Sequence, residues 1–398
     1  MLITRRALLQ KTGLLTQTAL LATLGCSPRK VPKQQGQTPQ VRFPGKVPMG
    51  VINDRPPCLE TPWRYYRYDL TPNDAFFVRW HLQAFPQEVD IDQWRLHIDG
   101  AVDRPLSLSL SELRTLGDEE VIAVNQCSGN SRSLFEPRVP GAQWGNGAMG
   151  NARWSGVSLA RLLKKAGVQK GAVQVIFDGL DEGPLSSVPD FVKSLSIEHA
   201  LQSNVMIAIA MNNEPIPMLN GFPARLVVPG YYATYWVKSL HKITVNTSVY
   251  DGYWMAKAYK LPASPNGCET PDKLSGNLVP ISRLNVRSFF TSPDPDQEVT
   301  VGKQCELDGI AFDGGDGIGK VEVSTDAGTQ WSEARLDPEL GRYSFRRWRY
   351  TWTPENPGSH VLKVRATTRS GQTQLAEPGW NRGGFMRNVI EELRLHAV

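Results

Sequence analysis

Residues 126–132 read Gln-Cys-Ser-Gly-Asn-Ser-Arg and closely follow the short apolar run Val121–Val124. The apolar run predicts a buried strand, and the small residues beyond it predict an open loop at the strand's end. Arg132 lies five residues after Cys127, and a nearby cation favours the thiolate, the form of cysteine that binds soft metals. The pattern marks Cys127 as a candidate metal ligand, although a buried structural cysteine is the commoner role for an isolated thiol.

Two further segments place cations where they can meet an anion. In residues 76–82, Phe-Phe-Val-Arg-Trp-His-Leu, the side chains of Arg79 and His81 lie on the same side of an extended chain. The alternative is a half-buried strand with two solvated polar positions. In residues 220–225, Asn-Gly-Phe-Pro-Ala-Arg, and again at Lys238, the chain supplies a cation near the end of a predicted strand. Two such cations suit a pyrophosphate group.

The pattern of the chain changes in its middle and indicates two domains. Short strand and helix patterns alternate over residues 51–265, including helical apolar spacing at Val157–Val168, which predicts a mixed α+β domain. Long helical patterns are absent from residues 280–398, where Asp326-Ala327-Gly328 is a hairpin signal and Val361–Thr367 alternates in polarity. We therefore expect an α+β protein whose second domain is an immunoglobulin-like β-sandwich.

Composition narrows the class of protein. The chain has 398 residues, of which 40% are hydrophobic, so each of two domains can have its own core. The net charge of +5 is modest and does not require a nucleic-acid partner. The five cysteines are scattered and form no C-x-x-C pair, zinc-ligand spacing or C-x-x-C-H haem-attachment motif. An odd number of cysteines in an exported protein leaves at least one of them outside any internal disulfide.

The N-terminal residues have the pattern of an export signal. Within residues 1–26, Arg5-Arg6 precedes a short apolar stretch, which predicts a signal of the twin-arginine type and a periplasmic protein exported in its folded state. An ordinary secretion signal is the alternative. Gly25-Cys26 also resembles a lipoprotein cleavage site, although Thr23 stands where an aliphatic residue is expected, so a lipid anchor at Cys26 stays open. Residues 27–50 are polar and proline-rich, and we expect a flexible linker there.

Five of these motifs together resemble the sulfite oxidase family of molybdopterin enzymes. They occur in the family's order and approximate spacing: residues 77–81 (FVRWH), 126–132 (QCSGNSR), 221–230 (GFPARLVVPG), 236–238 (WVK) and 258–260 (AYK). The run at residues 146–154 (NGAMGNARW) looks most like the bacterial periplasmic sulfite dehydrogenases, which are sulfite:cytochrome c oxidoreductases. The resemblance extends from about residue 76 to residue 388.

The resemblance implies a role for each matching residue. Cys127 matches the ligand of molybdenum, and Arg79, Arg132 and Tyr259 match residues of the substrate pocket. Residues that match cofactor contacts are Phe77, Arg79, His81, Cys127, Asp181, Asn220, Arg225 and Lys238. A further pocket arginine comes from residues 380–388 (WNRGGFMRN). The bacterial Met-Arg-Asn pattern favours Arg387, whereas the animal pattern points to Arg382, and we prefer Arg387.

The resemblance also implies the chemistry. A dioxo molybdenum–molybdopterin cofactor would oxidise sulfite to sulfate and pass electrons to an external acceptor, for which we expect a c-type cytochrome; direct transfer to dioxygen, as in the plant enzymes, is the alternative. Sulfite is a small anion that convergent guanidinium groups can bind. Competing hypotheses are a sulfane dehydrogenase or another oxidoreductase on the same fold, and a cofactor-free binding or scaffold protein. A methionine-sulfoxide reductase is less favoured because that branch generally lacks the C-terminal sandwich. The C-terminal domain predicts either a homodimer or a complex with a cytochrome subunit.

Overall fold

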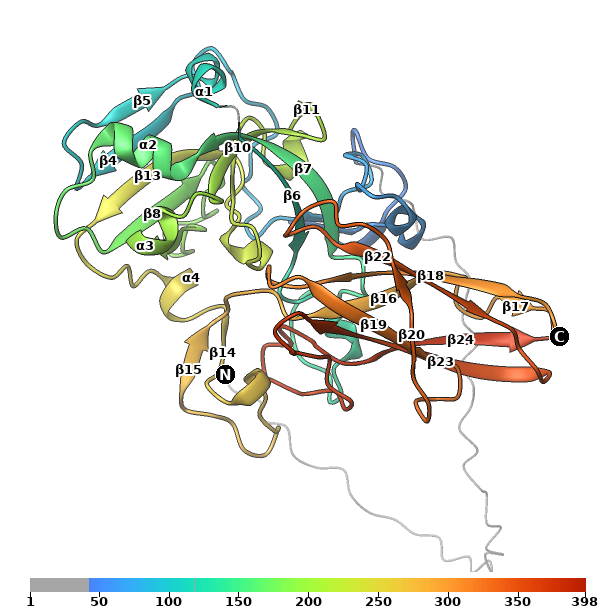
Figure 1. Cartoon of the computed structure of the whole chain (residues 1–398). Coiled ribbons are helices and arrows are strands. Elements are labelled where there is room, and N and C mark those ends of the chain that lie inside the picture. Colours follow the sequence, from blue (N-terminus) through green and yellow to red (C-terminus); the bar gives the residue numbers. More distant parts are fainter. Residues whose placement is uncertain (1–42, 118) are drawn as a thin grey trace, which may run out of the picture. The chain divides into compact units, whose positions relative to one another are not determined.

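The computed structural model describes residues 43–117 and 119–398 (Figure 1). The predicted export signal, with Arg5-Arg6 and Cys26, lies outside the described residues. No helix in the described part of the chain is both long and apolar enough to span a membrane.

Two sheets form the first half of the described chain. One has the strand order β11 (Glu214–Pro215), β10 (Met206–Met211), β7 (Met149–Ser158) and β6 (Glu119–Gln126), with β12 (Arg225–Val227) also pairing with β10. The other has the order β5 (Leu106–Leu108), β4 (Leu96–Gly100), β13 (Leu240–Asn246), β8 (Gln174–Gly179) and β9 (Lys193–Ser196). Strand β13 runs parallel to β4 and antiparallel to β8. A small third sheet joins β1 (Gly50–Asp54), β2 (Pro57–Glu60) and β3 (Val78–Arg79).

Short helices lie between these strands. Helix α1 (Leu110–Leu116) begins with a capping box in which the Ser109 hydroxyl accepts from the Glu112 N–H and the Glu112 carboxylate accepts from the Ser109 N–H. Helix α2 (Leu159–Ala166) ends at Gly167, which has the left-handed conformation typical of a helix C-terminus. It is shorter than the expected helix over 157–168, because Val157 and Ser158 still pair with β10 as the end of β7. Helices α3 (Ile197–Ala200) and α4 (Tyr253–Ala256) are single turns.

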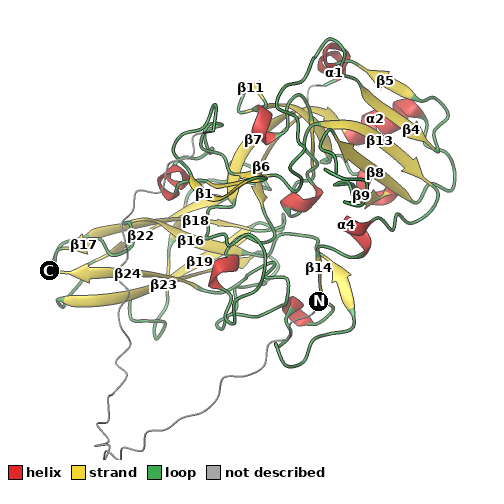
Figure 2. Ribbon diagram, turned by 180° about the vertical axis from the view of Figure 1, so that it is seen from behind, coloured by secondary structure: helices red, strands yellow, loops and turns green. Residues whose placement is uncertain are grey.

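The C-terminal region is the predicted β-sandwich (Figures 1 and 2). One sheet has the order β16 (Arg287–Ser292), β18 (Cys305–Phe312), β22 (Arg346–Trp352) and β21 (Arg335–Leu336). The other has the order β17 (Glu298–Val299), β24 (Glu391–Ala397), β23 (Gly358–Thr368), β19 (Ile318–Ser324) and β20 (Ser332–Glu333). The alternating residues of β23 that were expected to face one side, Leu362, Val364 and Ala366, are fully buried.

Two details differ from the sequence-based expectation. The hairpin signal at residues 326–328 predicts one strand after the turn, but the chain there forms two: β20 pairs with β19 while β21 pairs with β22, so the chain changes sheets at the buried Ala334. The segment 27–50 was expected to be a flexible linker, but its C-terminal end is hydrogen-bonded to the folded domain. The Lys46 ammonium donates to the backbone carbonyls of Asn73 and Phe76 and, at 2.7 Å, to the Asn220 side chain.

The α+β region and the sandwich share a hydrophobic cluster. It joins Val124 of β6 and Met149 of β7 to Phe289 of β16 and Ile310 of β18. A short hairpin of β14 (Lys260–Pro262) and β15 (Leu278–Pro280) connects the two regions along the chain. The shared cluster fixes the loop after β6 against the sandwich.

Candidate active site

Cys127 lies where β6 ends, with 7% of its surface exposed. Its backbone N–H donates to the carbonyl of Ala148 at 2.9 Å, which holds the start of the loop against β7. The loop then turns back through Ser131, whose φ of 70° is unusual for a residue other than glycine. Strained backbone of this kind is concentrated at functional sites.

Arg132 is buried at the end of the same loop. Its Nη1 donates to the carbonyl of Ala142 and its Nε to the carbonyl of Gly383, both at 3.1 Å. The guanidinium also lies over the ring of Phe385. A Cβ atom at Gly129 would lie 2.5 Å from Arg132 Nη2, so a glycine there allows the guanidinium to fold back on its own loop.

Most of the predicted cofactor residues line one cavity. The predicted residues along it are Phe77, Arg79, His81, Cys127, Asn220, Arg225, Lys238 and Tyr259. These residues come from strands and loops that are far apart in the sequence, and the fold brings them together.

The remaining predicted residues, Arg132 among them, lie outside the lining of this cavity. Asp181 is buried, and Lys238 is a neighbouring charge that partly offsets the effect of burial on the Asp181 pKa. Arg387 forms an ion pair with Glu391. Arg382 is tied to Glu269, with Nη2 donating to its Oε2 at 2.6 Å and Nε donating to its Oε1 at 2.8 Å.

The cavity carries an excess of buried positive charge. Lys238 Nζ donates to the Arg79 carbonyl at 2.7 Å, and Arg225 donates to the carbonyls of Asn220 and Trp236. Among residues 43–117 and 119–398, neither cation has a carboxylate within ion-pair distance. Burial lowers the pKa of Arg225 to about 9 and that of Lys238 to about 7, with Asp181 partly offsetting the change at Lys238. Buried charge without a partner is costly, so the site is built to receive an anion.

Several polar atoms along the cavity also lack a protein partner within the described ranges. They are His81 Nδ1, Asn125 Nδ2, Ser128 Oγ, Arg225 Nε and Thr234 Oγ1. Buried polar atoms are nearly always hydrogen-bonded, so such a cluster indicates a polar ligand. Asn125, Ser128 and Thr234 were not predicted from the sequence. Ser128 lies within the motif at residues 126–132, Asn125 lies directly before it, and Thr234 lies between two other motifs, but their residue types alone carry no signal.

His81 and Tyr259 form a second part of the cavity wall. The His81 Nε2 and the Tyr259 hydroxyl are hydrogen-bonded. Burial lowers the pKa of His81 well below its ordinary value, so its imidazole is neutral. Burial raises the pKa of Tyr259 to about 12, so its hydroxyl keeps its proton at neutral pH. The pair therefore presents neutral hydrogen-bonding groups beside the guanidinium of Arg79.

Lys193 is a buried cation that sequence reasoning missed. It is 2% exposed, and its Nζ donates to the carbonyl of Trp254 at 2.6 Å and lies over the rings of Tyr235 and Tyr259. Burial lowers its pKa from 10.5 to about 7. No sequence motif marks this lysine, because its environment comes entirely from distant segments.

Lys193 predicts how the ligand-free protein responds to pH. Its folded pKa lies below its unfolded pKa, so between about pH 7 and 10.5 the unfolded state binds more protons and stability rises with pH. One such group contributes about 1.4 kcal/mol per pH unit to the free energy of unfolding. Lys193→Met should flatten the rise by about that slope in denaturant titrations between pH 7.5 and 9.5. The exposed Lys303→Met is the control, and an unchanged slope in Lys193→Met would contradict the interpretation.

The chemistry of the donor set limits what the site can hold. The described part of the chain contains no group of three or more His, Cys, Asp or Glu residues that could hold a metal ion. A metal at Cys127 would therefore take its other ligands from a non-protein group. The unpaired cations and polar atoms suit an anionic organic cofactor that carries such a metal.

Comparisons with known proteins agree with this description. Residues 81–254 match the family model described as oxidoreductase molybdopterin binding domain, and residues 279–397 match the Mo-co oxidoreductase dimerisation domain. Sulfite oxidase of Gallus gallus is 34% identical over 352 residues, covering 84% of this chain and 74% of that protein. Mitochondrial sulfite oxidase of Rattus norvegicus is 30% identical over 388 residues, covering 93% of this chain and 70% of that protein.

The lengths and the solved structures add two facts. This chain spans 62% of the length of the macaque and human sulfite oxidases that it also matches. The crystal structure of the sulfane dehydrogenase SoxCD from Paracoccus pantotrophus has a TM-score of 0.73 at 24% identity, covering 86% of this chain and 85% of that chain. This similarity shows that the two proteins share the fold.

Proposed function

The chain belongs to the sulfite oxidase family of molybdopterin enzymes, and from this premise we propose that it oxidises sulfite to sulfate at a molybdenum–molybdopterin centre. The observation that carries the proposal is the Cys127 thiol at the end of a cavity that has excess buried positive charge. Cys127 would hold the metal. Arg225 and Lys238 would hold the anionic part of the cofactor.

The chain's own residues would bind and orient the substrate. The cofactor, when bound, supplies oxygen-atom transfer and accepts the electron pair. The guanidiniums of Arg79 and Arg132 are always charged and would bind the oxygen atoms of sulfite. The Tyr259 hydroxyl, which is hydrogen-bonded to neutral His81, would donate a hydrogen bond at the same place. Burial of these groups excludes water and strengthens each of these interactions.

The decisive experiment follows cytochrome c reduction after anaerobic addition of sulfite to purified protein whose molybdenum content has been measured. We propose that a c-type cytochrome is the natural acceptor, as in the bacterial sulfite dehydrogenases that residues 146–154 resemble. Sulfite-dependent reduction in proportion to molybdenum content is the expected result. Reduction with a protein-bound persulfide but not with sulfite would favour the sulfane dehydrogenase alternative. Protein without molybdenum from a host that makes the cofactor would favour a scaffold.

We also propose that residues 279–397 form a homodimer, which the match to a dimerisation domain supports. Light scattering of the pure protein tests this directly. A mass of one chain, or a mass that rises only when a cytochrome is added, would support the heterodimer instead.

We further propose export to the periplasm by the twin-arginine route, on the basis of Arg5-Arg6. Replacing both residues with lysine keeps the charge but removes the motif. The double variant should accumulate in the cytoplasm with its cofactor, and sulfite oxidation should move from the periplasmic to the cytoplasmic fraction. Unchanged periplasmic activity would show that another route operates. Labelling of the wild-type protein with a radioactive fatty acid, and its loss in Cys26→Ala, would establish the lipid anchor.

A further inference from the structure

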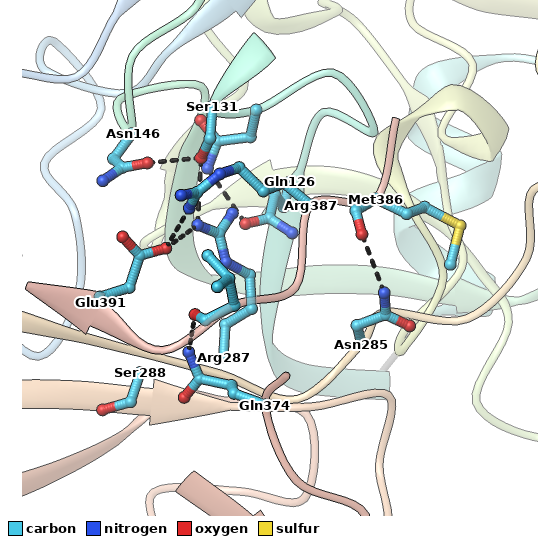
Figure 3. A network of polar contacts seen from close by, with 12 residues as sticks. Gln126, Ser131, Asn146, Asn285, Arg287, Ser288, Gln374, Met386, Arg387 and Glu391 are labelled. Carbon is cyan, nitrogen blue, oxygen red and sulfur yellow. Dashed lines mark hydrogen bonds and ion pairs between the residues drawn. The ribbon is translucent and has the colours of Figure 1, made fainter. Parts of the chain in front are cut away.

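One oxygen of Glu391 is shared by two buried arginines (Figure 3). Glu391 Oε1 lies 2.5 Å from Arg287 Nη2 and 2.9 Å from Arg387 Nη1. The exposed fractions of the three side chains are 10% for Glu391, 1% for Arg287 and 13% for Arg387. Glu391 begins β24 and Arg287 begins β16, so both come from the sandwich. A single carboxylate therefore neutralises two guanidiniums in a buried place.

Arg287 also reaches the loop that carries Cys127 and Arg132. The same Nη2 atom donates to the Ser131 hydroxyl oxygen at 3.0 Å, as Figure 3 shows. Ser131 is held on two more sides, because its N–H donates to the Gly145 carbonyl at 2.6 Å and its hydroxyl donates to the Asn146 side chain. Ser131 directly precedes Arg132 and has a left-handed backbone. The hydrogen bond from Arg287 thus fixes the position of Ser131, and with it the point at which the backbone of Arg132 begins.

The segment before Glu391 contacts the same loop from another side. The Met386 N–H donates to the carbonyl of Ser128 at 2.7 Å, and the Gly383 carbonyl accepts from Arg132 Nε. Met386 also has a positive φ, of 55°, and its carbonyl accepts from Asn285. The ion pair of Arg387 with Glu391 anchors the end of this strained segment to the sandwich.

We propose that Glu391, acting through Arg287 and Arg387, is a positioning residue that holds the Cys127–Arg132 loop from the sandwich and thereby sets the affinity of the site for its oxyanion substrate. The proposal rests on the proposed function for the identity of that substrate. Without the carboxylate, two buried guanidiniums repel each other and lose their common acceptor. Arg287 would then leave Ser131, and Arg387 would leave its present position.

Glu391→Gln tests the proposal, because it keeps the size of the side chain and removes its charge. A charge-assisted hydrogen bond is worth enough to change affinity by about ten- to a hundred-fold. We expect the KM for sulfite and the Kd for sulfate to rise by about that factor, with kcat per molybdenum changed far less. Sulfate binding is measured by calorimetry, independently of turnover. The matched control is Glu322→Gln, which breaks a Glu–Arg pair between β19 and β23 of the sandwich and should leave both constants unchanged.

Ser131→Ala provides a milder second variant in case Glu391→Gln fails to fold. It removes the hydroxyl that accepts from Arg287 and donates to the Asn146 side chain, and we expect a rise of about two- to ten-fold in the same two constants. Unchanged sulfite KM and sulfate Kd in folded Glu391→Gln, or in Ser131→Ala if Glu391→Gln does not fold, would overturn the proposal, as would an equal change in Glu322→Gln. If wild-type protein binds sulfate but does not oxidise sulfite, the proposed function fails while sulfate affinity still decides the positioning role. Wild-type protein that neither binds sulfate nor oxidises sulfite overturns both.

Discussion

Cys127→Ser is expected to abolish sulfite oxidation while the protein remains folded. Serine is close to cysteine in size, but its hydroxyl is a hard and largely protonated donor, whereas a thiolate is a soft ligand suited to this class of metal. Loss of a hydrogen-bond partner of a metal ligand typically costs about 10–100-fold. Loss of the ligand itself should cost more, leaving turnover at the background of the assay. The backbone bond from residue 127 to Ala148 does not involve the side chain, so the loop can keep its conformation.

The measurement is sulfite-dependent cytochrome c reduction per molybdenum, together with the near-ultraviolet circular dichroism of the folded protein. Cys305→Ser is the matched control, because Cys305 is a half-buried free thiol in the sandwich, on β18. We expect normal turnover from this control. Turnover close to wild type in molybdenum-loaded Cys127→Ser protein would show that the thiol is not the protein's ligand.

Strands could be predicted from the sequence where a run or an alternation of apolar residues ended at clear turn-forming residues. The apolar alternation of β23 and the apolar run in β6 were confirmed, because burial of one or both faces of a strand imposes its own pattern on the sequence. The crossing at Ala334 was missed because the two short strands on either side read as one run. The β14–β15 hairpin was missed because Leu261–Pro280 is rich in turn-forming residues and has no alternation.

The candidate site divides in the same way. Motif residues such as Arg79, Cys127 and Arg225 could be found because they stand in short runs of distinctive composition. Lys193 and Glu391 could not, because each is an ordinary charged residue at the start of a strand and its importance comes from its partners. Arg287 and Ser131 are 156 residues apart along the chain. A contact of that kind is produced by tertiary packing and leaves no local pattern in a single sequence.

Lys238→Met should release the cofactor without weakening the ligand-free fold. Lys238 Nζ donates only to the Arg79 carbonyl among the hydrogen bonds of the described residues, and the lysine lies over the ring of Trp80. Burial lowers the pKa of Lys238 to about 7, so the charged form of this lysine is unfavourable in the ligand-free protein and becomes favourable when an anion binds. Removing one charged hydrogen bond should weaken retention of the cofactor by about ten- to a hundred-fold. Adding Arg225→Met should roughly multiply the loss, if the two cations hold separate oxygen atoms.

Lys238→Met should lower cofactor retention without lowering the stability of the cofactor-free protein, and this combination makes the test specific. Molybdenum and pterin content after extended dialysis should fall in Lys238→Met, while chemical unfolding of cofactor-free protein should show equal or greater stability than wild type, because an apolar side chain replaces a poorly compensated charge. Lys242→Met is the control on strand β13, which begins two residues after Lys238, since Lys242 is half-exposed and pairs with Asp99. It should keep its cofactor. Full cofactor content in dialysed Lys238→Met would remove this lysine from the binding site, and a marked loss of stability in the cofactor-free variant would show that its role is structural.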